Sequence, residues 1–132
     1  AARVYAVDVG RDQLHASLRA DPRVINMEGR DARDLCAQDF VEPPQIIVCD
    51  ASFISLKLVL PVPLSLAAAD ATLVALVKPQ FEVGRANIGK GGLVRDEEAR
   101  AAALADVANA ARTTGFVVRG DRESPVPGAK GR

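Results

Sequence analysis

The chain has 132 residues, of which 48% are hydrophobic and 26% are charged, and its formal net charge is zero. These values predict one globular domain with a hydrophobic core and exclude a disordered chain. A zero net charge produces no whole-molecule field that would attract nucleic acid or membranes, so such binding must depend on local patches. No apolar run reaches the roughly 18 residues of a membrane span, and the first residues lack a signal-peptide pattern. We therefore expect a soluble, cytoplasmic protein with no membrane partner.

The cysteines and the histidine do not form a metal motif. Cys36 and Cys49 are too far apart in the sequence for a short ligand motif, and the chain contains one histidine. Cys49 falls in an apolar run, which is typical of a buried thiol in a reducing compartment. We expect no metal site.

The first part of the sequence alternates strand and helix patterns. A β-branched and aromatic run predicts a strand over residues 3–7 that ends in Asp8. Leucines at helical spacing then predict a helix over residues 12–20, which a proline ends. A second short strand is expected over residues 24–27, followed by a brief helical turn around Leu35.

The middle of the sequence repeats this alternation. The apolar run Ile46–Cys49 is too short for a helix and predicts a strand buried on both faces. We expect a helix over residues 53–60, capped by Ser52 and continued to about residue 69 after a proline kink. Another strand is expected over residues 72–77, where a lysine and a proline end the apolar run.

The last part predicts one long helix and one strand. Asp96 is a good N-cap, two glutamates follow in the first turn, and Gly115 fits just past the helix end. Residues 116–119 are expected to form the last strand, before a proline-rich tail. The whole alternation predicts an α/β fold of the Rossmann-like, doubly wound type, with a mostly parallel sheet covered by helices on both faces.

Charged residues follow the ends of the predicted strands. In a parallel sheet these positions share one edge, where ligands of open α/β folds bind. Convergence of several charges at that edge is hard to explain by packing. The residues concerned are Asp8, Asp31, Asp50 and Lys78.

Asp8 is a candidate for holding a nucleoside. A carboxylate that ends an early strand can accept hydrogen bonds from both hydroxyls of a ribose. The alternative is an aspartate that only caps a turn or helix. The glycine-rich fingerprint that should precede such a strand is missing from this sequence.

Asp50 and Lys78 end two successive strands, which are usually neighbours, so we expect their side chains to meet. A partly buried lysine can lose its charge far below its free pKa of ~10.4, and a nearby carboxylate fixes its orientation. Such a lysine can activate a hydroxyl. A purely structural ion pair at the strand ends is the alternative.

The loop over residues 84–95 is glycine-rich and basic. Its string GRANIGKG differs at one position from the phosphate-binding loop G-x-x-x-x-G-K-[ST], because Gly91 replaces the residue that binds magnesium. The next helix also begins too late to present its N–H groups to a phosphate. We therefore expect a mobile lid or a basic surface that contacts RNA through Arg85, Lys90 and Arg95.

Four segments, in this order and spacing, resemble the methyltransferase domain of the TlyA (hemolysin A) family: VYAVDVGRDQLHASLRADPRV, IIVCDASFISL, LVALVKPQFEVGR and KGGLVRD. That family belongs to the FtsJ-like methyltransferases, which use S-adenosylmethionine and methylate ribose 2′-hydroxyls of ribosomal RNA. The resemblance covers nearly the whole chain, and DASFISL followed by KPQFE is a highly specific pair.

The resemblance implies a role for each strand-end residue. Asp8 would bind the ribose of S-adenosylmethionine, and Asp31 would lie near the adenine amino group. Asp50 borders the cofactor and matches, together with Lys78, two members of the family's Lys-Asp-Lys-Glu catalytic set. Asp50 would orient Lys78, which would position the 2′-hydroxyl and help to deprotonate it. The pocket would be shaped by Ser52, Phe53, Pro79, Gln80 and Phe81.

The sequence departs from the family pattern at both ends. The family's first strand with its glycine loop, the first catalytic lysine and an S4 RNA-binding domain are expected before residue 1. A final strand with the closing glutamate is expected after SPVPGAKG. We therefore expect residues 1–132 to be an internal part of the catalytic domain, inactive alone, with ribosomal subunits as partners of the parent protein. The alternatives are a noncatalytic RNA-contact module and a pore-forming protein.

Overall fold

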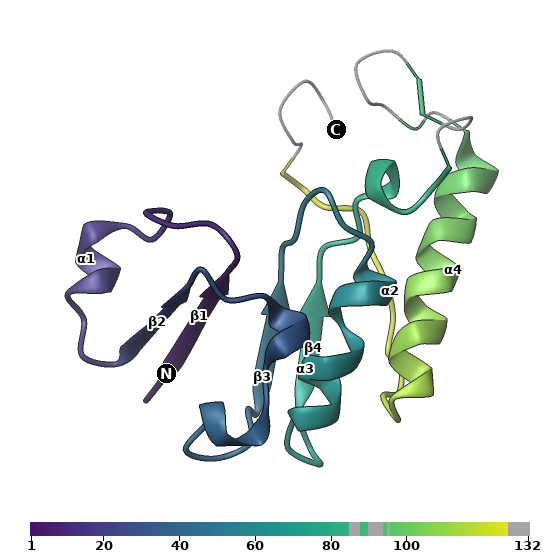
Figure 1. The fold of residues 1–132 in the computed structure, drawn as a ribbon. Coiled ribbons are helices and arrows are strands. Elements are labelled where there is room, and N and C mark those ends of the chain that lie inside the picture. The colour runs from purple at the N-terminus through teal and green to yellow at the C-terminus, as the bar shows by residue number, and fades with distance from the viewer. Residues whose placement is uncertain (85–87, 90–93, 95, 127–132) are drawn as a thin grey trace.

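The structure is a computed structural model that describes residues 1–84, 88–89, 94 and 96–126 (Figure 1). It contains short strands that pair in parallel and in sequence order. These are β1 (Val4–Asp8) with β2 (Val24–Glu28), and β3 (Ile46–Cys49) with β4 (Thr72–Ala75). All of them end on the same side of the molecule (Figure 1). The α/β class with parallel strands is confirmed.

Helices and short 3-10 turns connect the strands. The helices are α1 (Ala16–Arg19), α2 (Leu56–Val59), α3 (Pro61–Leu66) and α4 (Glu97–Thr113). The 3-10 turns are η1 (Ala32–Asp34), η2 (Ala37–Asp39) and η3 (Pro79–Phe81). As expected, Asp96 caps α4 through its side chain, and Gly115 follows the end of that helix in a left-handed conformation, with φ 93°.

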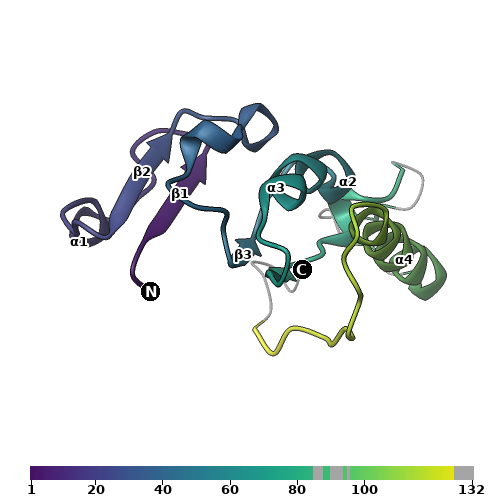
Figure 2. The same cartoon turned by 90° about the horizontal axis from the view of Figure 1, so that it is seen from below.

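The strands form two separate two-stranded sheets instead of one continuous sheet. Figures 1 and 2 show β1 on the side of its sheet that faces β3. Within the described residues, β1 pairs with β2 and β3 pairs with β4, but β1 and β3 do not pair. The segment that contains η1 bridges the two sheets, because η1 packs against α2 and α3.

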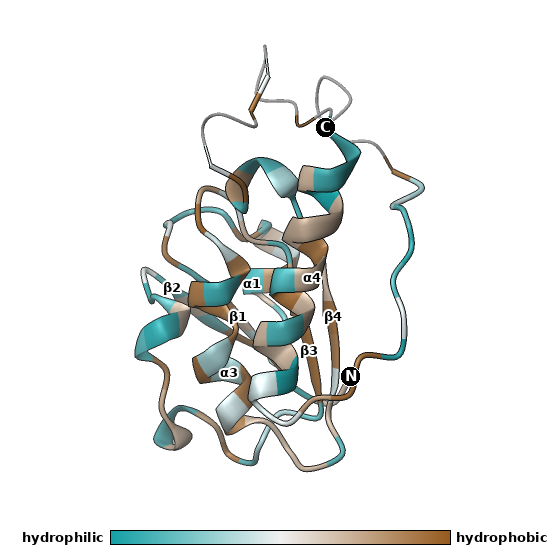
Figure 3. Cartoon of the chain, turned by 90° about the vertical axis from the view of Figure 1, so that its right-hand side faces the viewer, coloured by the Kyte–Doolittle hydropathy of each residue, from teal (hydrophilic) through white to brown (hydrophobic). Residues whose placement is uncertain are grey.

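The hydrophobic core lies on one face of the second sheet. Its buried members come from α2, α3 and α4, and they are Leu56, Leu60, Leu64, Val107 and Ala111. Alternate strand residues pack against this cluster, whereas Ile46, Val48 and Val74 point away from it and are exposed. Figure 3 shows the hydrophobic colour of both strands. In the described residues, helices cover one face of this sheet, and the other face is exposed.

Two predicted helices begin later than expected. The first begins at Ala16, because Asp12 adopts φ 57°, outside the helical region. The helix expected from residue 53 begins at Leu56, because Phe53 has φ 64°. Ser55 caps that helix in place of Ser52, since its hydroxyl accepts the N–H of Lys57.

Two predicted strands also differ. The strand expected over residues 72–77 ends at Ala75, after which the chain turns toward Pro79. Residues 116–119 do not form a strand. Phe116 donates its N–H to Ala111 at the helix end instead, and Val117 is exposed, so this segment continues the helix cap and joins no sheet.

Candidate active site

Lys78 and Asp50 meet where β3 and β4 end. The Lys78 ammonium lies 2.6 Å from a carboxylate oxygen of Asp50 and donates a hydrogen bond to the Ser52 hydroxyl at 2.8 Å. The register of the sheet explains this meeting, because Cys49 pairs with Ala75 as the last pair of the ladder. The lysine side chain is 23% exposed and the aspartate 71%. The ammonium is thus fixed by two partners while the carboxylate faces solvent.

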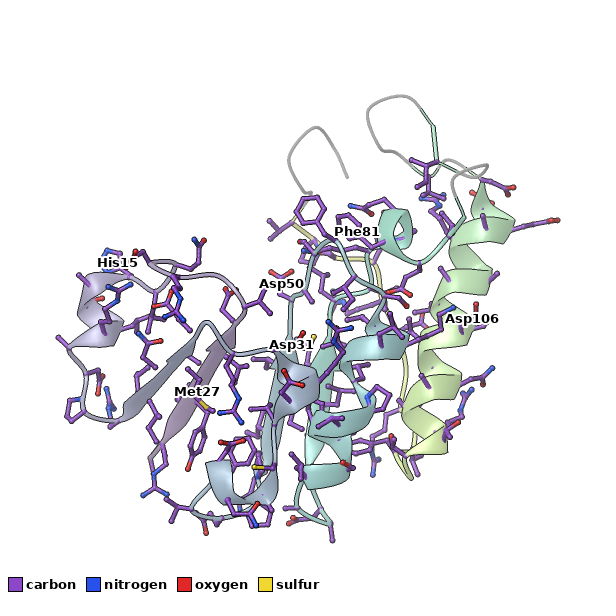
Figure 4. The ribbon with its side chains drawn as sticks, in the orientation of Figure 1. His15, Met27, Asp31, Asp50, Phe81 and Asp106 are labelled. Atoms are coloured by element: carbon purple, nitrogen blue, oxygen red, sulfur yellow. The ribbon has the colours of Figure 1, made fainter. Side chains whose placement is uncertain are left out.

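Two aromatic rings pack together on the loops that carry this ion pair. Phe53 and Phe81 lie with ring centroids 5.1 Å apart and an interplanar angle of 52°. Phe53 is 89% exposed and has the left-handed φ already noted. Pro79 begins the 3-10 turn that brings Phe81 back toward the end of β3. Figure 4 shows Asp50 and Phe81 on the same side of the molecule, at the ends of the strands.

Glu82 is a functional candidate that the sequence analysis missed. Its carboxylate accepts a hydrogen bond from the Ser55 hydroxyl at 2.5 Å and another from the Leu56 N–H at 2.8 Å. It therefore ties the loop after β4 to the beginning of α2. The available signal was the glutamate in KPQFE, four residues after the lysine, but its partner Ser55 could not be found from spacing.

Asp8 ends β1, as expected, beside a small cavity. One of its oxygens accepts the N–H of Gly10 at 2.8 Å. The cavity measures about 130 Å³ and is lined by Ala6, Val7, Asp8, Gln13, Leu14 and Glu28. Its acidic lining suits a group that donates hydrogen bonds, such as a sugar hydroxyl.

Glu28 organises the loop beside Asp8 and was also missed. One carboxylate oxygen accepts the N–H groups of Gln13 (2.5 Å) and Leu14 (3.4 Å), and the other accepts from Arg19 and Asn26. The side chain is only 8% exposed. The hydrogen bond from the Gln13 N–H is the main reason why the pKa of Glu28 is lowered.

Asp31 lies on the bridging segment, where it caps η1 (Figure 4). The guanidinium and N–H of Arg33 donate four hydrogen bonds to its two oxygens, at 2.7 to 3.2 Å. These bonds, above all those from the guanidinium, lower the pKa of Asp31 to about 2. Three donor groups of Arg33 thus engage both oxygens of Asp31.

The structure thus joins Asp50 to Lys78 and places Asp8 on the other sheet. The predicted RNA-binding residues Arg85, Lys90 and Arg95 lie outside the described residues. In the part of the chain that is described, no three His, Cys, Asp or Glu side chains gather as they would around a metal ion. No helix among the same residues is both long and apolar enough to cross a membrane.

Asp8 ends one strand of this parallel α/β fold, and the Asp50–Lys78 pair lies at the ends of two others, on the edge where open α/β sheets bind ligands. The family comparison specifies the class of protein. Residues 1–132 match the FtsJ-like methyltransferase family over their whole length, and the chain belongs to this family.

Several relatives are similar over nearly the whole chain. It is 46% identical to the 16S/23S rRNA (cytidine-2′-O)-methyltransferase TlyA of Mycobacterium tuberculosis, over 99% of the chain and 49% of that protein. Hemolysin A of Brachyspira hyodysenteriae is 39% identical over 99% of the chain and 55% of its own length. A solved structure of a protein described as a hemolysin, from Streptococcus thermophilus, superposes with TM-score 0.92 and 43% identity, over 99% of this chain and 48% of that one. The predicted family and fold are confirmed, and the chain spans about half the length of these relatives.

Proposed function

We propose that this chain forms the catalytic part of an S-adenosylmethionine-dependent methyltransferase that modifies ribose 2′-hydroxyls of ribosomal RNA. The observation that carries this proposal is the contact of Lys78 with Asp50 and Ser52 at the ends of β3 and β4. The family and the activity in the name of the TlyA relative support the substrate class.

The chemistry of the cavity beside Asp8 fits part of the cofactor. Asp8 uses one oxygen for Gly10, which leaves acceptor positions for ribose hydroxyls. Asp31 fits less simply, because both of its oxygens already accept hydrogen bonds from Arg33. Asp50, exposed at the neighbouring strand end, would border the cofactor. When bound, S-adenosylmethionine supplies the methyl group.

Lys78 is the proposed catalytic residue, and Asp50 orients it. The ammonium can hold the oxygen of a 2′-hydroxyl in line with the methyl group, which reduces the entropy cost of the reaction. The same side chain can assist removal of the hydroxyl proton once it has lost its own proton. Ser52 and Asp50 fix the nitrogen for both steps, since each contacts it directly.

RNA contacts are proposed for the loop and for the exposed ring. A flat aromatic ring that is 89% exposed beside the ion pair can stack on a nucleobase, as Phe53 would. Arg85, Lys90 and Arg95 would contact phosphates. Each lost phosphate contact should lower the salt slope of RNA binding by about 0.7 to 0.9. Unchanged affinity and salt dependence in neutral variants would remove this role.

We also propose that a further strand joins the two sheets in the full-length protein. Parallel strands are usually buried on both faces and paired on both sides. In the described residues, β1 and β3 face each other without pairing. A strand from outside residues 1–132, for which the greater length of the relatives leaves room, would pair with both edges. A solved full-length structure without such a strand would disprove this point.

The test of the proposed function is Lys78→Ala in the full-length protein, assayed for methylation of ribosomal subunits. General acid–base assistance is typically worth about 10²- to 10⁴-fold, so turnover should fall by at least this order while cofactor affinity is kept. Lys57→Ala is the matched control, because Lys57 forms only a surface pair with Asp106 at 3.7 Å. Wild-type turnover of Lys78→Ala would make the lysine a structural charge, and RNA binding without any methylation by the wild type would favour a noncatalytic module.

A further inference from the structure

We infer that Glu82 is a positioning residue for the reaction. Its carboxylate fastens the loop after β4 to the beginning of α2 and thereby keeps Lys78 in contact with Asp50 and Ser52. The inference rests on the proposed function, because it concerns how the proposed catalytic lysine is held. It adds a residue that does not itself touch the reacting atoms.

The contacts of Glu82 use both carboxylate oxygens. One oxygen accepts from the Ser55 hydroxyl and the other from the backbone N–H of Leu56, the first residue of α2. Helices leave their first N–H groups without intrahelical partners, and a negative charge is favoured there. Glu82 satisfies one of these groups from a distant part of the chain. Because the bonds are partly buried, they are shielded from competing water.

The loop after β3 and the loop after β4 are consequently joined at two points. They meet first through Lys78 with Asp50 and Ser52. They meet again through Glu82, and the rings of Phe53 and Phe81, one from each loop, pack against each other. Neither loop can shift along the other without breaking one of the connections.

The backbone of Phe53 shows that this arrangement is constrained. A φ of 64° is unfavourable for a bulky residue and persists only where the surrounding structure fixes it. Phe53 follows Ser52 directly and precedes Ser55 by two residues. If Glu82 no longer holds Ser55, Phe53 can return to a negative φ. That rotation would move the Ser52 hydroxyl away from the ammonium of Lys78.

The experiment compares Glu82→Ala, Glu82→Gln and the control Glu97→Ala in the full-length protein. The measurement is the single-turnover rate of methyl transfer to ribosomal subunits at saturating S-adenosylmethionine. Glu97 is an exposed carboxylate in the first turn of α4. A misplacement of about 1 Å can cost on the order of 10²-fold in rate, so Glu82→Ala should lose about 10- to 100-fold without a change in cofactor or RNA affinity. Glu82→Gln, which keeps an acceptor for Leu56, should recover most of the rate.

The outcomes separate this inference from the proposed function. If Glu82→Ala keeps the wild-type rate while Lys78→Ala is inactive, the inference is wrong and the function stands. If both variants keep the wild-type rate, the catalytic role of Lys78 and this inference are both wrong, whereas a wild type without methyl transfer would refute the function itself. Equal losses in Glu82→Ala and Glu82→Gln, together with weaker cofactor binding, would show a general structural role and overturn the inference. Should Glu82→Ala fail to fold, Ser55→Ala removes one of the two hydrogen bonds that Glu82 accepts. An unchanged rate in Ser55→Ala would also overturn the inference.

Discussion

The two sheets of this protein are stabilised by different interactions. We define the β1–β2 unit as residues 4–41 and the β3–β4 unit as residues 44–116. Of the buried hydrophobic residues in the described chain, only Leu35 belongs to the first unit. The second unit contains the cluster formed by α2, α3 and α4. Hydrophobic burial therefore holds the unit with the Lys-Asp pair much more strongly than the unit with Asp8.

Hydrogen-bonded carboxylates take the place of a core in the β1–β2 unit. Glu28 holds the loop beside Asp8, and Asp39 pairs with Arg30 at 2.7 Å. The hydroxyl of Tyr5 accepts the N–H of Val41, and its ring meets Phe40 edge to face. The difference teaches that the two units of the fold can respond to different conditions. Acid and salt should weaken the β1–β2 unit, whereas cavities should weaken the β3–β4 unit.

The largest expected effect is that of Leu60→Ala in the β3–β4 unit. Leu60 is 1% exposed, and truncation of a buried leucine costs about 2–5 kcal/mol through lost burial and a residual cavity. The free energy of unfolding, measured by denaturant titration with helix circular dichroism, should fall by that amount. Leu58→Ala, two residues earlier in α2, is the control, because Leu58 is 57% exposed. Equal losses in both variants would show that the described core does not stabilise this unit.

A smaller effect is expected from Glu28→Gln in the β1–β2 unit. Glutamine offers one acceptor oxygen in place of two, so the N–H groups of Gln13 and Leu14 compete with Arg19 and Asn26 for it. The chain has one tyrosine and no tryptophan, so the fluorescence of Tyr5 reports this unit.

In Glu28→Gln, the tyrosine signal should change at lower denaturant than in the wild type, while the circular dichroism of α4 keeps its midpoint. Glu42→Gln is the control, since Glu42 is an exposed carboxylate directly after this unit. A common shift of both signals would mean that the two units unfold together, which would contradict the comparison.

The sequence predicted the parts of the fold that local patterns determine. The strand Ile46–Cys49 and the capped helix α4 were predicted correctly, because apolar runs and caps act over a few residues. The shortened starts of α1 and α2 were not predicted. They accompany the positive φ of Asp12 and Phe53, which the apolar spacing that predicts a helix does not encode.

The candidate site was likewise predicted only where local patterns determine it. The meeting of Asp50 and Lys78 was predicted, because successive parallel strands place their ends together. Glu28 and Glu82 were missed, since each binds backbone N–H groups that lie about 15 and 26 residues away in the chain. The engagement of Asp31 by Arg33 was also missed, although the two residues are close in sequence. A spacing of two residues leaves the side chains free to point apart, and only the turn at η1 brings them together.

Acidification should weaken the β1–β2 unit in a defined pH window. The guanidiniums of Arg23 and Arg33 lower the pKa values of Asp21 and Asp31 from the usual 3.8 to about 2. Between these values the unfolded chain binds more protons than the folded unit, so stability falls as the pH drops from about 4 to 2. Each pair is exposed and contributes little. The Tyr5 signal should therefore show a modest loss of stability in this window, and Arg33→Ala should reduce the loss. If the stability of the β1–β2 unit were constant from pH 4 to 2, this prediction would be wrong.

The smallest effect is a difference in thiol reactivity, and it needs no change in stability. Each unit carries one cysteine, with Cys36 exposed in the first and Cys49 packed against the core of the second. Burial raises the pKa of the Cys49 thiol, and only the thiolate reacts with alkylating or disulfide reagents. At neutral pH we expect one thiol to react rapidly and the other slowly, with Cys36→Ser removing the rapid phase.

Leu60→Ala should accelerate the slow phase because local opening of the β3–β4 unit exposes Cys49, while the rapid phase should stay the same. Equal acceleration of both phases would show that opening of one unit always opens the other.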